Sequence, residues 1–193
     1  MAASIGVLAL QGAFREHSRA LARCGALVKE VRQAQDVAGI DALVIPGGES
    51  TAIGKLLLML NMLEPLRQRI QQGMPVYGSC AGLILLCERI ENADGSVLPQ
   101  PRLGGLDATV RRNAFGRQVD SFETDLPVAG IEQPVHAVFI RAPFIVHTGA
   151  AVQVLATVGG NAVAVQQGRV LATSFHPELT DDLSIHRYFL SLI

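Results

Sequence analysis

The chain has 193 residues, of which 49% are hydrophobic and 17% are charged. Sixteen Lys and Arg residues against seventeen Asp and Glu residues give a net charge of −1, which offers no basic surface for nucleic acid or for an anionic membrane. This composition excludes an intrinsically disordered chain, and the length predicts a single domain over residues 1–193.

The cysteines and the apolar segments indicate the cellular compartment of the protein. Three cysteines without a framework spacing argue against a disulfide scaffold and favour a reducing compartment. The apolar segment 4–10 is short and has no preceding Lys or Arg, so we interpret it as a buried strand and not as a signal sequence. No apolar run approaches the roughly 20 residues of a membrane-spanning helix. The sequence therefore predicts a cytoplasmic protein.

Strand-like and helix-like segments alternate in the first half of the chain. Residues 4–10, 27–31 and 42–45 are predicted strands, and residues 14–23, 52–60 and 63–72 are predicted helices. This alternation is typical of a parallel sheet covered on both faces, in which sites form at the carboxyl ends of the strands. The predicted fold class is α/β, with three layers and a mostly parallel central sheet.

A Gly-Gly turn follows the third predicted strand, within residues 46–51. Ser50 or Thr51 is predicted to cap the next helix. Gly47 and Gly48 would let backbone N–H groups approach a ligand oxygen, as in an oxyanion hole or a carboxylate clamp. A plain turn is an equally good interpretation from these residues alone.

The most informative stretch is Gly-Ser-Cys-Ala-Gly at residues 78–82, between the apolar run 74–77 and the helix-like run 83–86. It predicts a nucleophile elbow, a sharp strand-to-helix turn that exposes Cys80 and forces it toward positive φ. The following helix N-terminus favours a thiolate and can hold an oxyanion. The alternative is a buried structural cysteine, an interpretation that fits Cys24 and Cys87 better, with Cys87 on the same helical face as Cys80.

In the second half of the chain, the alternation of strand-like and helix-like segments gives way to short strand-like segments. Residues 92–105 are predicted to form a loop, and residues 181–192 a closing amphipathic helix. Between them, short segments separated by turns predict strands that continue the sheet in antiparallel fashion; they are residues 107–111, 121–125, 135–139, 152–158, 162–166 and 170–174.

A catalytic thiol needs a base, and His176 is the best candidate among five histidines. It follows an apolar strand-like run, and Glu178 two residues later can fold back to accept a hydrogen bond from its imidazole. His17 and His186 lie on helices predicted to be exposed, where we expect solvated side chains. No set of residues has the spacing of metal ligands, so we expect neither a metal site nor a cofactor.

Several runs together resemble the class I (triad) glutamine amidotransferases, and within them the glutaminase subunits of pyridoxal 5′-phosphate synthase. The similarity extends over essentially the whole chain, and the runs that carry it are residues 6–12, 15–17, 46–51, 78–82, 112–118, 139–143 and 175–179. The resemblance implies a flavodoxin-like fold in which Cys80 is the nucleophile, His176 the general base and Glu178 its orienting partner.

The resemblance also implies a glutamine site and an oxyanion hole. The oxyanion hole would consist of the backbone N–H groups of Gly48 and Ala81. An arginine suits the substrate α-carboxylate because its planar fork donates two parallel hydrogen bonds. The implied substrate contacts are Gln11, Gly48, Glu49, Ser50, Arg112, Ile140 and Arg141. Other roles are open for three of these residues. Glu49 could serve as a negative charge at the start of a helix, and Arg112 and Arg141 could form structural ion pairs.

The reaction that the resemblance implies is hydrolysis of L-glutamine to L-glutamate and ammonia through a glutamyl thioester. The ammonia would pass to a synthase subunit that builds pyridoxal 5′-phosphate (vitamin B6), so the expected partners are glutamine and that subunit. Two other functions fit the residues: a cysteine hydrolase or peptidase, and a binding subunit that keeps the fold without catalysis.

Overall fold

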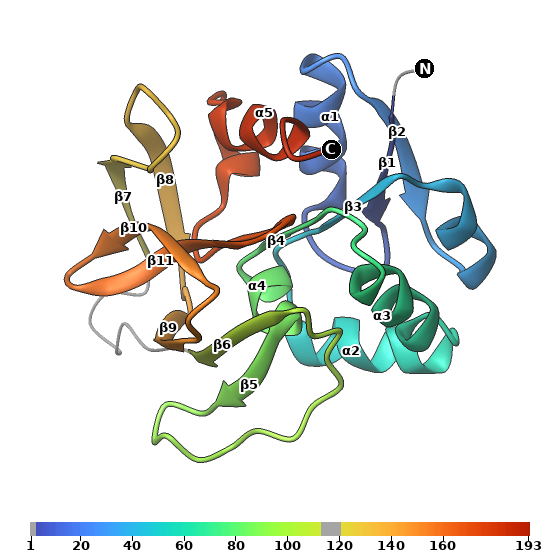
Figure 1. Ribbon diagram of the computed structural model, residues 1–193, viewed down its shortest axis with the longest axis horizontal. Helices are drawn as coiled ribbons and strands as arrows, with labels where there is room; N and C mark the ends of the chain where they lie inside the picture. Colours follow the sequence, from blue (N-terminus) through green and yellow to red (C-terminus); the bar gives the residue numbers. More distant parts are fainter. Residues whose placement is uncertain (1–2, 113–120) are drawn as a thin grey trace.

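The computed structural model describes residues 3–112 and 121–193, whose strands form a large mixed sheet and a two-stranded sheet (Figure 1). Four adjacent strand pairs at one side of the large sheet are parallel, and the other side contains antiparallel pairs. The order is β2 (Leu27–Val31), β1 (Ser4–Leu8), β3 (Ala42–Ile45), β4 (Val76–Ser79), β12 (Val170–Thr173), β11 (Asn161–Gln167), β9 (Phe144–Thr148), β6 (Leu106–Arg111) and β5 (Cys87–Glu91), with β10 (Gln153–Val158) on β11; β7 (Ser121–Leu126) pairs with β8 (Val135–Ile140).

Helices cover both faces of the parallel part, as predicted. Successive residues of β3 pack into different clusters: Ala42 and Val44 with one, Leu43 and Ile45 with the other. This alternation follows from the twofold period of a strand, and it explains why every residue of β3 is buried. The first cluster includes α1 (Phe14–Arg23) and α5 (Ser184–Leu190), and the second includes α2 (Ser50–Met59), α3 (Leu63–Gln71) and α4 (Ala81–Leu86) (Figure 1).

The second half differs from the prediction in three ways. β12 is parallel to β4 and not antiparallel, β7 and β8 form a sheet of their own, and the strands β5 and β9 were not predicted. Cys87 begins β5, so the prediction that it shares a helix face with Cys80 is wrong. The run of residues 83–87 is apolar throughout, and such a run carries no period that could mark where the helix ends.

The two-stranded sheet supports the region that follows β12. The ring of Phe139 on β8 stacks on that of Phe122 with 4.5 Å between centroids, and lies 5.5 Å from that of Phe175. The backbone N–H of His176 donates to the carbonyl of Val138, 2.8 Å away. These contacts fix the position of His176. Among the helices of the described residues, none has the length and apolar character needed to cross a membrane.

Candidate active site

Three neighbouring parallel strands bring the candidate residues to one edge of the sheet. β4 lies between β3 and β12, with Gly78 beside Ile45 and Ser79 beside Thr173. The N–H of Cys80 extends the pairing by donating to the carbonyl of Thr173, 2.8 Å away. Because the carboxyl ends of parallel strands coincide, the Gly-Gly loop, the elbow and the His176 turn must meet there.

The turn at Cys80 has the backbone of a nucleophile elbow. Cys80 has φ +48° and ψ −96°, which confirms the predicted positive φ. A Cβ on Gly82 would overlap the carbonyl oxygen of Ile45, and one on Gly78 would overlap the backbone of Gly82. Both flanking glycines are therefore required by the close approach of strand and helix, as the sequence pattern indicated.

His176 lies between the thiol and a carboxylate. Its Nδ1 is 2.8 Å from Oε1 of Glu178, whose side chain is fully buried, and His176 and Cys80 line the same cavity. Burial lowers the pKa of His176, but the hydrogen bonds and charges of Cys80 and Glu178 outweigh it and raise the pKa to about 10. The site therefore favours a protonated imidazole beside the sulfur.

Glu178 remains ionised although it is buried. Burial raises its pKa, but the hydrogen bonds of His17 and His176, together with the charge of His176, outweigh this effect and lower the pKa below its ordinary value. An ionised carboxylate can only accept hydrogen bonds, so it fixes the proton of His176 on Nδ1 and leaves Nε2 for the reacting groups.

A cavity of about 460 Å³ opens in front of Cys80 and His176. All seven residues expected to contact the substrate line it: Gln11, Gly48, Glu49, Ser50, Arg112, Ile140 and Arg141. Ala81 is buried beneath the cavity and does not line it. The lining also includes Gly47 of the Gly-Gly turn, together with residues that were not expected to contact the substrate, namely Gly12, Ala13, Ile84, Pro143 and Leu179.

The Gly-Gly loop is held by the segment that follows β1. The N–H of Glu49 donates to Oε1 of Gln11 at 2.8 Å, and the carbonyl of Gly47 accepts from the N–H of Ala13 at 2.9 Å. A Cβ on Gly47 would lie 2.6 Å from Nδ1 of His176. Glycine is therefore needed here to let the loop pass the imidazole.

The residue that caps α2 is Glu49, so the prediction of Ser50 or Thr51 as the cap is wrong. The Glu49 carboxylate accepts from the N–H groups of Thr51 at 3.0 Å and Ala52 at 2.8 Å. α2 begins at Ser50, one residue earlier than a serine cap would require. Glu49 thus both starts the helix and lines the cavity.

Arg112, like Glu49, both bonds neighbouring side chains and lines the cavity. Its Nη1 donates to Oγ1 of Thr51 at 3.1 Å and to Oε1 of Gln100 at 3.4 Å, and its Nη2 lies 3.3 Å from Oε1 of Glu49. These partners hold the guanidinium at the cavity wall. Arg141 lines the same cavity with φ +44°. The rest of the 112–118 motif, residues 113–118, lies outside the described residues.

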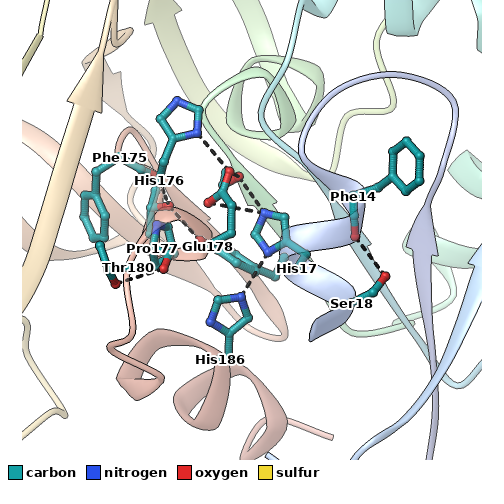
Figure 2. A network of polar contacts seen from close by, with 12 residues as sticks. Phe14, His17, Ser18, Phe175, His176, Pro177, Glu178, Thr180 and His186 are labelled. Carbon is teal, nitrogen blue, oxygen red and sulfur yellow. Dashed lines mark hydrogen bonds and ion pairs between the residues drawn. The ribbon is translucent and has the colours of Figure 1, made fainter. Parts of the chain in front are cut away.

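The prediction that His17 and His186 are solvated is wrong, because both are fully buried behind Glu178 (Figure 2). The helix period contained a signal for this position. His17 shares one face of α1 with the buried Ala20 and Leu21, three and four residues on, and His186 precedes the buried Phe189 by three residues on α5. Over the ranges that the structure describes, no group of His, Cys, Asp or Glu side chains is arranged to hold a metal ion.

Comparison with known proteins places this geometry in a family. Residues 7–193 match the SNO glutamine amidotransferase family. Proteins named pyridoxal 5′-phosphate synthase subunit PdxT are 58% identical in Parafrankia sp., over 98% of this chain and 92% of the relative, and 59% identical in Pelotomaculum thermopropionicum, over 96% and 93%. A crystal structure of a glutamine amidotransferase, 52% identical over 97% of each chain, superposes with a TM-score of 0.90. The chain belongs to the SNO glutamine amidotransferase family.

Proposed function

We propose that this chain is one glutaminase domain that hydrolyses the side-chain amide of L-glutamine, with Cys80 as nucleophile, His176 as acid and base, and Glu178 as its orienting partner. One observation carries the proposal. The parallel pairing of β4 with β12 delivers the thiol and the hydrogen-bonded His176–Glu178 pair to the same cavity.

The reaction begins with attack of the Cys80 sulfur on the carboxamide carbon. The oxyanion that forms would be held by N–H groups of Gly48 and Ala81, a role that stays a prediction; Ala81 is the first residue of α4, so its N–H has no acceptor within the helix. Protonated His176 then gives its proton to the departing ammonia, which leaves a glutamyl thioester. Water activated by the same imidazole releases glutamate.

The cavity wall suits an amino acid substrate. Arg112 and Arg141 bring positive charge to it, and a guanidinium can bind an α-carboxylate through two parallel hydrogen bonds. The backbone and side-chain acceptors at residues 48–50 and Gln11 lie on the same cavity and provide partners for the substrate ammonium group.

The ammonia needs a second active site, because free ammonia is protonated and lost in water. The relatives at 58% and 59% identity are named subunits of pyridoxal 5′-phosphate synthase, which supports delivery of the ammonia to a synthase subunit. The cytoplasm is the location that the cysteine content of the sequence favours. We further propose that docking of that subunit reorients a peptide in the loop 46–50, whose carbonyl at Gly47 is now held by the N–H of Ala13. An identical, competent loop in free and docked structures would contradict this.

The decisive experiment measures ammonia release from glutamine by the chain with and without the synthase subunit. We expect release that depends on the subunit and is absent from Cys80→Ser. A glutamine-analogue diazo ketone should label Cys80 alone, since burial raises the pKa values of both other thiols, Cys24 and Cys87. Cleavage of peptides but not of glutamine would support a peptidase, and failure of both release and labelling would support a non-catalytic binding subunit.

A further inference from the structure

Two buried histidines from opposite ends of the chain meet behind Glu178 (Figure 2). Nδ1 of His17, on α1, is 3.0 Å from Nε2 of His186, on α5. Nε2 of His17 is 3.0 Å from Oγ of Ser79 and 3.4 Å from Oε2 of Glu178. The hydroxyl of Ser79 in turn donates to Oε1 of Glu178 at 3.4 Å. The mechanism proposed above uses neither histidine.

The direction of these hydrogen bonds follows from what each partner can accept. The Ser79 hydroxyl donates its hydrogen to Glu178, so its oxygen is left to accept from His17. The Glu178 carboxylate can only accept as well. Nε2 of His17 must therefore carry a hydrogen, which points toward the Ser79 hydroxyl and the Glu178 carboxylate. Nδ1 of His17 then accepts from the Nε2–H of His186. This assignment leaves Nδ1 of His186 as an unpartnered lone pair in the described part of the chain, which costs less than a buried N–H without an acceptor. His186 therefore selects the tautomer of His17.

The second oxygen of Glu178 depends on His17. Oε1 accepts from His176 at 2.8 Å, whereas Oε2 is fully buried and has no well-directed hydrogen bond from any described residue. The ring nitrogen of His17, at 3.4 Å, is the polar group that faces Oε2. A buried carboxylate oxygen without such a partner is strongly disfavoured, and the carboxyl would rotate or take up a proton.

We propose that His17 is a positioning residue for the glutaminase reaction: backed by His186, it holds the carboxylate of Glu178 ionised and aimed at His176. This inference rests on the function proposed above. The side chains that orient His176 then form a chain of contacts that runs from His186 to His17, from His17 to Glu178, and from Glu178 to His176. The Ser79 hydroxyl bridges His17 and Glu178.

The test compares His17→Gln with His17→Asn. A glutamine amide nitrogen reaches the place of the imidazole Nε2 and can still serve Ser79 and Glu178, whereas an asparagine amide reaches only the place of Nδ1, beside His186. Both variants keep a polar group in the same buried space, so they are matched in folding cost. His136→Gln is the control, because His136 is a histidine with two carboxylate partners outside the site, Glu123 and Asp125.

The measurements are kcat, KM and the pH dependence of ammonia release in the presence of the synthase subunit. We expect His17→Asn to lower kcat at least tenfold with KM changed less than threefold, and His17→Gln to recover most of kcat. The acid limb of the His17→Asn profile should move to higher pH, because Glu178 loses a group that lowers its pKa. The other titratable groups that face Glu178 are His176 beside it, Tyr77 from β4 and His186 from α5, and they are unchanged.

The outcomes separate the two proposals. An active wild-type chain whose His17→Asn variant keeps its kcat and its acid limb would overturn the positioning role alone. Equal losses of kcat in His17→Asn and His17→Gln would also overturn it, since a merely structural role predicts no difference between them. A wild-type chain that releases no ammonia with the synthase subunit would overturn the proposed function and this inference with it. His136→Gln should keep the wild-type kcat and pH profile.

Discussion

Replacing His186 by glutamine should make the folding stability less sensitive to acid. Burial, assisted by His17, lowers the pKa of His186 from 6.5 to about 3, although Glu178 and Asp182 act in the opposite direction. Between these two pH values the unfolded chain binds a proton at this residue and the folded chain does not. Stability therefore falls as the pH drops below 6.5.

The size of the effect follows from the difference in proton binding. At pH 5 the unfolded imidazole is mostly protonated and the folded one is not, so the contribution is about 2 kcal/mol relative to pH 8. The value depends little on the folded pKa, because that pKa lies well below pH 5. The glutamine amide can still donate to His17 but cannot titrate.

The assay is urea unfolding followed by far-ultraviolet circular dichroism at pH 8, 7, 6 and 5, with the urea dependence checked for constancy. Between pH 8 and pH 5 the wild type should lose about 2 kcal/mol more than His186→Gln. Equal losses would show that His186 takes up its proton in the folded chain and would refute the reasoning. His136→Gln is a control of opposite sign: hydrogen bonds to Asp125 and Glu123 raise the pKa of His136, so its contribution is present below pH 6.5 and lost as the pH rises.

Four further changes probe the site. Cys80→Ser should abolish ammonia release while the unfolding midpoint in urea changes little, and release at the wild-type rate would exclude Cys80 as nucleophile. Glu178→Gln should lower kcat by roughly 10²- to 10⁴-fold and leave residual turnover, measured by steady-state kinetics, because a neutral amide cannot stabilise the imidazolium and can turn its NH₂ group toward Nδ1. Arg112→Ala should raise KM for glutamine roughly 10- to 100-fold with a smaller change in kcat, the loss of a charged hydrogen bond; an unchanged KM would place the carboxylate elsewhere. Gly82→Ala should destabilise the chain by roughly 1–3 kcal/mol in urea, because its methyl group meets the backbone of Ile45.

The central strands of the parallel half were predictable because they are buried on both faces. Such strands appear in the sequence as short continuous apolar runs, and β3 has the predicted bounds. The edge strand β2 also has its predicted bounds, although most of its residues are exposed. The Gly-x-Cys-x-Gly pattern also predicted its own geometry, since Gly78 and Gly82 are fixed by local contacts of the elbow. The expectation that Cys80 and His176 meet came from the need of a thiol for a base and from the family resemblance, since β12 was predicted to be antiparallel; their chemical roles stay predictions.

The features that the sequence did not predict depend on contacts between distant segments. Whether β12 runs parallel or antiparallel to its neighbour is decided by where the chain re-enters the sheet, which is not a property of residues 170–173. The burial of His17 depends on α5, a helix at the other end of the chain. A polar residue with a distant partner resembles a solvated one in its local sequence, and only the third- and fourth-neighbour pattern on α1 indicated otherwise.

The direct pairing of β4 with β12 means that the chain builds the sheet beyond β12 first, with β5, β6, β9, β10 and β11, and only then returns to lie beside β4. Turns within this segment, between Cys87 and Arg169, such as the one at Gly159 and Gly160, can lengthen or shorten during evolution without altering the spacing of sulfur and imidazole. The exposed turns are thus free to acquire new surfaces while the cavity residues of the same segment stay in place, and descendants of one hydrolytic centre could serve different acceptor enzymes by changing these turns alone.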